Sequence, residues 1–343
     1  MPTFKEIFFN ISTPVAAVSS LRFLRAVTGI RRIVPVYHAV ADEVPGYLRY
    51  LYRVQNTREF IKDLDGLLKY FKPVDLHELV DRHGSGKKKE EPVCHLTFDD
   101  GLKEFHEIVA PILLKKGIPA TCFLNNAFID NHDMLFRLKA SLLIDHLHKQ
   151  GPASSAWINF HDWVQKYHYG NTYYRKLLLS LKVNDTVKID ELASMLEISF
   201  PEFLKKYRPY MTSTMIRELI DKGFTFGAHT FSHVDFRDLD EKEQLEEIKK
   251  SIDDLEQRFD LKYRIFAFPF TDFGIKASLF RKLTDEAICS LTFGCAGIKK
   301  DMNPISIQRI PIESFTGGMK SILKKEYLYN TLLQMTGMGK MKR

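Results

Sequence analysis

Short apolar runs alternate with amphipathic helical stretches along much of this chain, and this alternation constrains its fold more than any other feature. Residues 93–98 and 120–124 are apolar runs typical of buried strands, and a helix pattern with one apolar side lies between them at 105–113. Gly117 and Pro119 end that helix before the second strand begins. A strand–helix–strand order of this kind predicts a parallel sheet.

The same pattern continues on both sides of this unit. A helix is expected at residues 54–71, with Asn56 as its N-cap. Further strands are expected at residues 32–37, 224–228, 263–268, 288–293 and 305–312, with helices near 245–259 and 279–283. Residues from about 132 to 205 break the alternation, because they hold several helix-like stretches and no convincing strand. The sequence therefore predicts an α/β protein with a helical insertion.

Composition excludes several other classes of protein. Hydrophobic residues make up 45% and charged residues 27% of the 343 residues, which is ordinary for a globular protein and excludes disorder or a coiled coil as a description of the whole chain. No window approaches 18 consecutive apolar residues, so a transmembrane helix is not expected. The formal net charge of +7 permits an anionic partner without requiring one. Nucleic acid is not expected as a partner, since no DNA- or RNA-binding motif is present.

The cysteines are too few for a disulfide scaffold. Cys94 and Cys122 lie inside apolar runs, and we interpret them as free thiols in the core. No pair of cysteines has the spacing of a thiolate zinc site.

The two ends of the chain differ from its middle, which we take as one domain at residues 32–315. Residues 1–31 form an amphipathic segment that either packs on the domain or lies on a membrane surface. A cleaved signal peptide is a weaker alternative, because Asn10, Ser12, Thr13 and Pro14 interrupt the apolar run. Residues 316–343 form a basic tail, either a terminal helix covering the domain or a contact with an anionic membrane. The expected location is therefore cytoplasmic or membrane-peripheral.

Polar residues follow directly after three of the predicted strands. They are Asp99-Asp100-Gly101 after the strand at 93–98, His229 and His233 after the strand at 224–228, and residues 269–272 after the strand at 263–268. In parallel α/β folds the carboxyl ends of the strands lie on one face, where ligands bind. We therefore expect these three segments to converge.

The first two segments together have the composition of a metal site. Asp99 and Asp100 repel each other and resist desolvation, so another group must offset that cost. His229 and His233 are four residues apart, and we expect a helical turn that brings both imidazoles to one face. Two neutral histidines and one carboxylate leave coordination positions open for water, as in catalytic divalent sites. Each motif alone has an ordinary explanation as a turn or a capping pair, but their joint placement favours a metal. Zinc is the favoured ion, with cobalt, nickel or manganese as alternatives.

These motifs resemble those of a known family. Residues 97–101 (TFDDG) and 229–233 (HTFSH) are similar to the first two motifs of the polysaccharide deacetylase (NodB-homology) family. Tyr37-His38 and the stretch at 73–76 (PVDL) resemble one large branch of it. The resemblance spans about residues 33–312, apart from the insertion. It implies a distorted (β/α) barrel, and a metal-dependent hydrolase that removes N-acetyl groups from amino sugars of a polysaccharide or lipid-linked glycan.

The resemblance also implies roles for individual residues. By motif position, Asp100, His229 and His233 would hold the metal. Asp99 would be the general base that takes a proton from metal-bound water as that water attacks the amide carbonyl. The backbone N–H of Phe270 would stabilise the resulting oxyanion.

The chain departs from the family pattern at its third motif, Arg-x-Pro-Tyr. The matching residues are 267–270 (AFPF), so Ala267 stands where the arginine that orients the base is expected. Arg309, near another predicted strand, is a candidate replacement. Pro269, Asp272 and Arg309 are also candidate substrate contacts, with an ordinary turn as the alternative for Asp272.

A second departure concerns the general acid. The family has a late catalytic histidine, whereas no histidine follows His233 here. His38 is the candidate by position, with a buried structural histidine as the alternative. The two departures leave open a catalytically impaired glycan-binding protein on the same fold.

Overall fold

The centre of the molecule is a parallel sheet that nearly closes into a barrel. In the computed structural model, which describes residues 3–85, 91–170 and 172–343, the strand order is β11-β9-β8-β7-β6-β5-β2-β12, and all the pairings are parallel. The strands are β2 (Pro35–Tyr37), β5 (Leu96–Phe98), β6 (Ala120–Leu124), β7 (Thr225–Ala228), β8 (Ile265–Ala267), β9 (Leu291–Gly294), β11 (Ser306–Gln308) and β12 (Ile310–Pro311). The predicted parallel sheet and barrel are confirmed.

One extended segment joins the two edges of the sheet. β11 and β12 are separated only by Arg309, and they pair with β9 on one side and β2 on the other. The strand expected at 305–312 is thus a single run that changes partners at Arg309, and this change closes the barrel.

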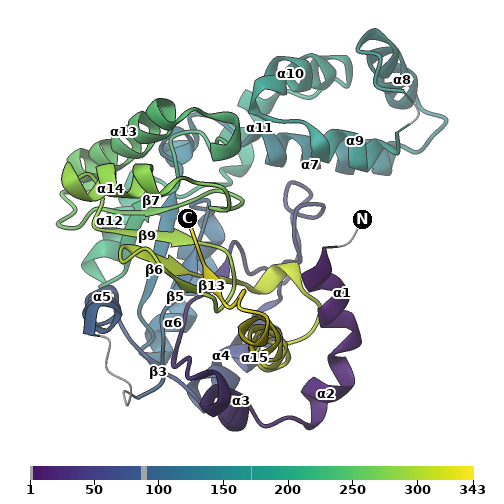
Figure 1. The fold of residues 1–343 in the computed structure, drawn as a ribbon. Coiled ribbons are helices and arrows are strands. Elements are labelled where there is room, and N and C mark those ends of the chain that lie inside the picture. The colour runs from purple at the N-terminus through teal and green to yellow at the C-terminus, as the bar shows by residue number, and fades with distance from the viewer. Residues whose placement is uncertain (1–2, 86–90, 171) are drawn as a thin grey trace.

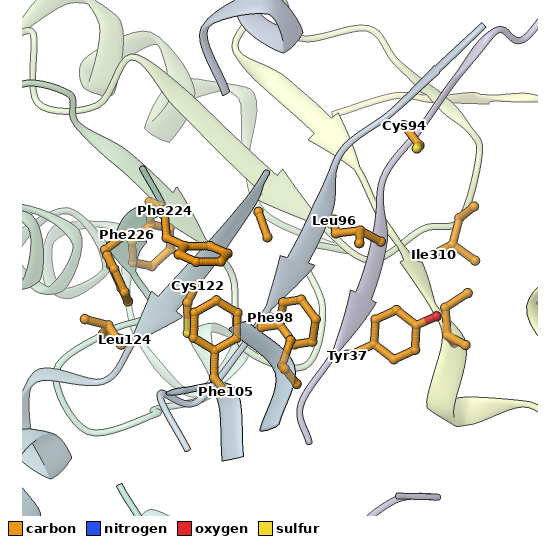
Figure 2. Packing of buried hydrophobic residues seen from close by; sticks show 14 of the residues in the cluster. Tyr37, Cys94, Leu96, Phe98, Phe105, Cys122, Leu124, Phe224, Phe226 and Ile310 are labelled. Atoms are coloured by element: carbon orange, nitrogen blue, oxygen red, sulfur yellow. The ribbon is translucent and has the colours of Figure 1, made fainter. Parts of the chain in front are cut away.

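Side chains alternate between the inside and the outside of the barrel, as the pleat of a strand requires. Phe123 of β6 packs inside with residues of β8 and β9 such as Ile265 and Phe293. Its neighbours Cys122 and Leu124 point outward into the core between barrel and helices, where Figure 2 shows aromatic rings around them. Free Cys94 and Cys122 are buried in this core, as predicted.

Helices cover the outside of the barrel and share this outer core with the strands. They are α4 (Thr57–Leu68), α6 (Ala110–Lys116), α12 (Ser213–Asp221), α13 (Glu241–Phe259) and α14 (Ala277–Asp285). α5 (Leu76–Ser85) packs differently, because its Leu76 and Leu79 belong to the cluster inside the barrel. Asn56 caps α4 through a bond from the Glu59 N–H, as expected. The polar composition of residues 83–91 (HGSGKKKEE) predicts a loop, but the first of these residues belong to α5, and residues 86–90 lie outside the described residues.

The helical insertion is confirmed and has a core of its own around Trp163. Its helices are α7 (Phe136–Gln150), α8 (Ser155–Lys166), α9 (Tyr174–Ser180), α10 (Thr186–Met195) and α11 (Phe200–Tyr207). In Figure 1 the insertion stands out to one side of the barrel. It is anchored where α7 begins, close to the carboxyl ends of the strands.

The two ends of the chain pack together on the barrel. α1 (Phe4–Ile11), α2 (Thr13–Val18) and α3 (Leu21–Thr28) wrap around α15 (Met319–Met335), which also contacts α4 (Figure 1). Two small sheets, β1-β4-β3 and β10-β13, complete the fold. Their strands are β1 (Arg32–Ile33), β3 (Lys72–Pro73), β4 (Val93–Cys94), β10 (Lys300–Asp301) and β13 (Lys340–Met341). Among the described residues, no helix combines the length and the apolar character needed to cross a membrane.

Candidate active site

The alternation of the strands aims several polar side chains into the mouth of the barrel. In β5 the outward residues are Leu96 and Phe98, so Asp99 points inward. The same period brings His38 inward after β2 and His229 inward after β7. These three residues line a cavity of about 270 Å³ at the carboxyl ends of the strands. The convergence expected from the sequence is therefore present.

A left-handed turn separates the roles of the two adjacent aspartates. Asp100 and Gly101 have φ values of 71° and 65°, a region that glycine adopts readily and aspartate seldom does. This turn directs Asp100 into the cavity beside Asp99 instead of onto the opposite face. A Cβ on Gly101 would also lie 2.8 Å from the end of the Leu124 side chain, so both the positive φ and the packing favour glycine here.

Asp100, His229 and His233 meet at one point. Their ligand atoms all lie within 4.8 Å of one another. Asp100 Oδ1 is 3.4 Å from His233 Nε2 and 3.8 Å from His229 Nε2. The expected helical turn is wrong: residues 229–234 form a loop, in which Thr230 and His233 have positive φ. Backbone strain of this kind is typical of functional sites, and here it turns the second imidazole back toward the first.

The donor set fits a divalent metal. Ligands about 2 Å from one ion at tetrahedral angles lie roughly 3.4 Å apart, close to the distances observed. Asp100 Oδ1 is buried without a hydrogen-bond partner in the described chain. His229 Nδ1 lies 2.8 Å from the Ala267 carbonyl oxygen; if it donates there, Nε2 is left as a lone-pair donor toward the cavity. Burial lowers the pKa of His233 to about 4, which favours the neutral ring that a metal requires.

Asp99 is held as an anion by a buried arginine. Arg309 Nη1 and Nη2 donate to the two Asp99 oxygens at 2.6 and 2.9 Å, and both side chains are almost fully buried. Burial alone would raise the pKa of Asp99, but the Arg309 guanidinium outweighs it and holds that pKa at about 2. Arg309 thus lies behind Asp99 and does not line the cavity, so its predicted contact with the substrate is not supported by its position.

His38 is paired with a carboxylate that the sequence analysis missed. Its Nδ1 is 2.6 Å from Glu313 Oε2, and its backbone N–H donates to Glu313 Oε1. The ring stacks on Tyr52 with centroids 4.3 Å apart. Burial would lower the pKa of His38, but Glu313 raises it to about 9, so the imidazole is protonated at neutral pH.

Of the predicted site residues at 269–272, only Phe270 lines the cavity. Phe270 lines the cavity, and its backbone N–H meets no acceptor among the described residues, so it is free to donate to a ligand. Pro269 and Asp272 do not line the cavity. The Asp272 carboxylate accepts instead from Gln308 and from Arg343, which explains its burial and removes it from the candidate substrate contacts.

Sequence reasoning missed Glu313, Tyr52 and Arg137, all of which line the cavity. Glu313 follows the last strand of the barrel, so the rule that located Asp99 and His229 would also have found it. Tyr52 and Arg137 come from loops and from the insertion, where no strand pattern points to the site.

Comparisons with known proteins agree with this fold. The sequence model of the family described as polysaccharide deacetylase matches residues 86–284. The deacetylase PplD of Streptococcus pyogenes, solved with acetate, is 15% identical with a TM-score of 0.52, over 87% of this chain and 96% of that one. IcaB from Ammonifex degensii is 17% identical with a TM-score of 0.52, over 86% and 96%. At these identities the structures establish the fold alone. No curated protein sequence matches the chain.

Proposed function

Because the chain belongs to the polysaccharide deacetylase family and is a hydrolase of that class, we propose that it removes N-acetyl groups from amino sugars of a glycan or glycolipid. The observation that carries this proposal is the meeting of Asp100, His229 and His233 at one point beside Asp99. The reaction splits the amide C–N bond with water and yields acetate and a free amine.

Asp100, His229 and His233 would hold a divalent ion, with zinc favoured and cobalt, nickel or manganese as alternatives. Such an ion would polarise the acyl carbonyl and lower the pKa of water toward neutrality.

The chain's own residues would move the protons. Asp99, kept ionised and oriented by Arg309, accepts a proton from the attacking water. The Phe270 N–H donates to the carbonyl oxygen as negative charge develops on it. His38, kept protonated and oriented by Glu313, donates a proton to the departing nitrogen. Arg309 and His38 thus offer the two functions whose family residues are absent from the sequence, which weakens the case for an impaired binding protein.

The test is a screen for acetate release combined with metal analysis. The purified chain is incubated with chitin oligomers, peptidoglycan and lipid-linked N-acetylglucosamine, and released acetate is measured. Asp99→Asn should cut turnover by about 10²- to 10⁴-fold while the bound metal is retained. Asp285→Asn, on the exposed side of α14, is the matched control and should leave turnover unchanged.

Full activity in the Asp99→Asn variant would remove Asp99 from its role as base. Stoichiometric metal without acetate from any of these glycans would favour the alternative, a glycan-binding protein on this fold.

A further inference from the structure

Arg137 lies in the catalytic cavity without a partner for its charge. It is the second residue of α7, where the insertion leaves the barrel, and it is partly buried. Its guanidinium packs over the Phe270 ring at 5.4 Å from the centroid. It makes no hydrogen bond or ion pair with any residue that the structure describes. Burying a cation is unfavourable unless it is paired, so this position calls for a ligand that supplies the missing charge.

The other charges of the cavity are already matched. Arg309 is paired with Asp99, and His38 is paired with Glu313. Asp100 is the carboxylate whose charge acts on Arg137, and in the proposed function that carboxylate holds the metal. With the ion bound, the cavity therefore carries excess positive charge, and Arg137 is the cation that no described acid balances.

A second cavity begins on the other side of Arg137. It measures about 190 Å³ and shares Arg137 and Phe270 with the catalytic cavity. Its other cations are matched, since Lys182 pairs with Asp238 and Arg237 pairs with Asp235. Arg137 thus stands between the site of chemistry and a neighbouring space that could receive the next part of a substrate.

We propose that Arg137 binds an anionic group of the substrate, a phosphate or a carboxylate, next to the acylated sugar. This inference rests on the proposed function and narrows it, since the substrate would be an anionic amino sugar and not a neutral polymer. Arginine suits the role because its planar guanidinium donates two parallel hydrogen bonds to such oxygens.

The first experiment measures binding, so that it does not depend on turnover. Calorimetry compares the amine products glucosamine 1-phosphate, muramic acid and glucosamine on the metal-loaded chain. At least one anionic sugar should bind about 10- to 100-fold more tightly than glucosamine, and Arg137→Gln should abolish this preference. Arg137→Lys should retain part of it. Arg281→Gln, an exposed arginine on α14, is the control and should retain all of it.

The outcomes are separable. A preference for only one of the two anionic sugars identifies phosphate or carboxylate. Equal binding of all three sugars, or a preference that survives in Arg137→Gln, overturns the inference. Turnover of Arg137→Gln is also compared with that of the unaltered chain on neutral and on anionic N-acetyl substrates. An equal loss on both kinds of substrate overturns the inference too, because it would mean that Arg137 stabilises the oxyanion of the reaction. If no acetate is released from any substrate but the Arg137-dependent preference remains, the hydrolase proposal fails and the anion site stands.

A separate observation concerns the outer face of the N-terminal helices. Phe4, Ile7, Ile11, Val15 and Val18 recur every three or four residues along α1 and α2, and all five side chains are exposed. Phe23 and Val27 of α3 are exposed as well. We call these seven residues the apolar stripe. The inner faces of the same helices are buried against α15, so the stripe is a second, uncovered apolar face.

The stripe is a concentration of exposed apolar surface and not ordinary scatter. Of 17 large hydrophobic side chains exposed in the described chain, seven belong to it, while the others are spread over the remaining length. Exposed apolar side chains concentrated in neighbouring elements of this kind are typical of contact surfaces.

The charge around the stripe favours an anionic lipid surface over a second copy. The helices α1–α3 carry three cations, Lys5, Arg22 and Arg25, and a single acid, Glu6. Lys5 is paired with Glu326 of α15, whereas Arg22 is exposed and Arg25 donates to the Tyr70 carbonyl, so the positive excess comes from these two arginines of α3. A symmetric dimer would bring this positive excess against itself. An amphipathic helix with apolar and basic groups binds instead in the interface of an anionic bilayer. We propose that the apolar stripe docks the chain peripherally on such a bilayer.

Vesicle co-sedimentation tests this proposal with the full chain. Binding to vesicles containing phosphatidylglycerol should exceed binding to pure phosphatidylcholine vesicles and should weaken in high salt. The double variant Ile11→Ser and Val18→Ser should lose binding, while acetate release from soluble substrates is unchanged. The matched control, Ile158→Ser and Val187→Ser, changes two similarly exposed residues of the insertion and should bind normally.

Equal sedimentation of the two double variants, or no binding by the unaltered chain, overturns the membrane proposal. A dimer seen by light scattering and lost in the Ile11/Val18 variant also overturns it, because it identifies a second copy as the partner.

Discussion

Arg309 shows how a residue from elsewhere in the chain can take the position of an arginine that is absent from its usual motif. The family arginine is absent at Ala267, yet Arg309 reaches Asp99 from the segment that closes the barrel. Its inward direction follows from the strand period, because Ile307 also points inward and Ile310 points outward. The orientation of Asp99, the proposed base, therefore depends on a residue 210 positions away in the sequence.

Removing Arg309 should lower the stability of the fold and also slow the proposed reaction. Arg309→Gln leaves Asp99 buried without its counter-charge, and breaking a buried pair costs about 3–5 kcal/mol. Urea unfolding of the metal-free chain measures this loss. Arg53→Gln, which breaks an exposed pair with Glu59, is the control and should cost less than about 1 kcal/mol. A similarly small loss for Arg309→Gln would mean that the pair contributes little to stability.

His95 should make the fold sensitive to acid. It is buried inside the barrel between the Val74 carbonyl and the Thr121 hydroxyl, and burial lowers its pKa from 6.5 to about 4. The unfolded chain therefore takes up this proton first, so stability is complete above pH 6.5 and falls as the pH drops toward 4. The loss attributable to His95 is about 2 kcal/mol at pH 5.

The measurement is urea unfolding at pH 7 and pH 5 for the unaltered chain and for His95→Gln. The variant should lose about 2 kcal/mol less on acidification. His77→Gln, at an exposed position, should behave like the unaltered chain. An identical acid loss in His95→Gln and the unaltered chain would contradict this account of His95.

At the scale of elements, close packing between strands limits which residues each strand can hold. Gly227 of β7 faces the barrel interior, where a Cβ would lie 2.7 Å from the side chains of Phe123 and Ile265. This close approach allows β7 to carry His229 to the cavity in register with β6 and β8. The period-two pattern therefore does more than bury apolar residues, because it sets the direction of the residue that follows each strand.

Two glycine-to-alanine changes should have opposite effects. Gly227→Ala overfills the barrel interior and should destabilise by about 1–3 kcal/mol. Gly66 lies in the last turn of α4 with nothing within 4 Å of an added Cβ, so Gly66→Ala should stabilise by about 0.4–1 kcal/mol. Thermal unfolding of both variants checks the pair. Destabilisation by Gly66→Ala, or no effect of Gly227→Ala, would contradict the packing described.

At the scale of the whole molecule, the candidate metal site connects distant parts of the chain. Asp100 follows β5, whereas His229 and His233 follow β7, and the insertion lies between them in sequence. The unfolded chain holds these residues far apart, so an ion should bind the folded state preferentially and stabilise it by mass action.

Metal should therefore raise the thermal stability of the chelated chain. At a zinc concentration about 100 times Kd, the gain is about 2.7 kcal/mol, and Tm should rise by several degrees. The double variant Asp100→Asn and His229→Gln should show no rise, and a chelator should reverse the rise in the unaltered chain. An equal rise in both proteins would indicate that zinc binds elsewhere.

Much of this architecture was predictable because local patterns encode it. Short apolar runs and the helical stretches of period 3.6 between them identified the parallel strands, and the residues after each strand identified Asp99, Asp100, His229 and His233. The path of the chain after a strand was less predictable. The loop at 229–233 was expected to be helical, because nothing in its sequence indicates the positive φ values of Thr230 and His233.

Local sequence therefore specified which residues end the strands, since hydrophobic burial imposes a short-range period that can be read along one chain. The ion-pair and hydrogen-bond partners of those residues depend on the tertiary structure, because they come from segments that only the closed barrel brings together. Closure brings Arg309 to Asp99, Glu313 to His38, and Arg137 to the rim of the cavity. Charge pairing depends on the distance between two side chains in space, and the number of residues between them in the sequence does not predict that distance.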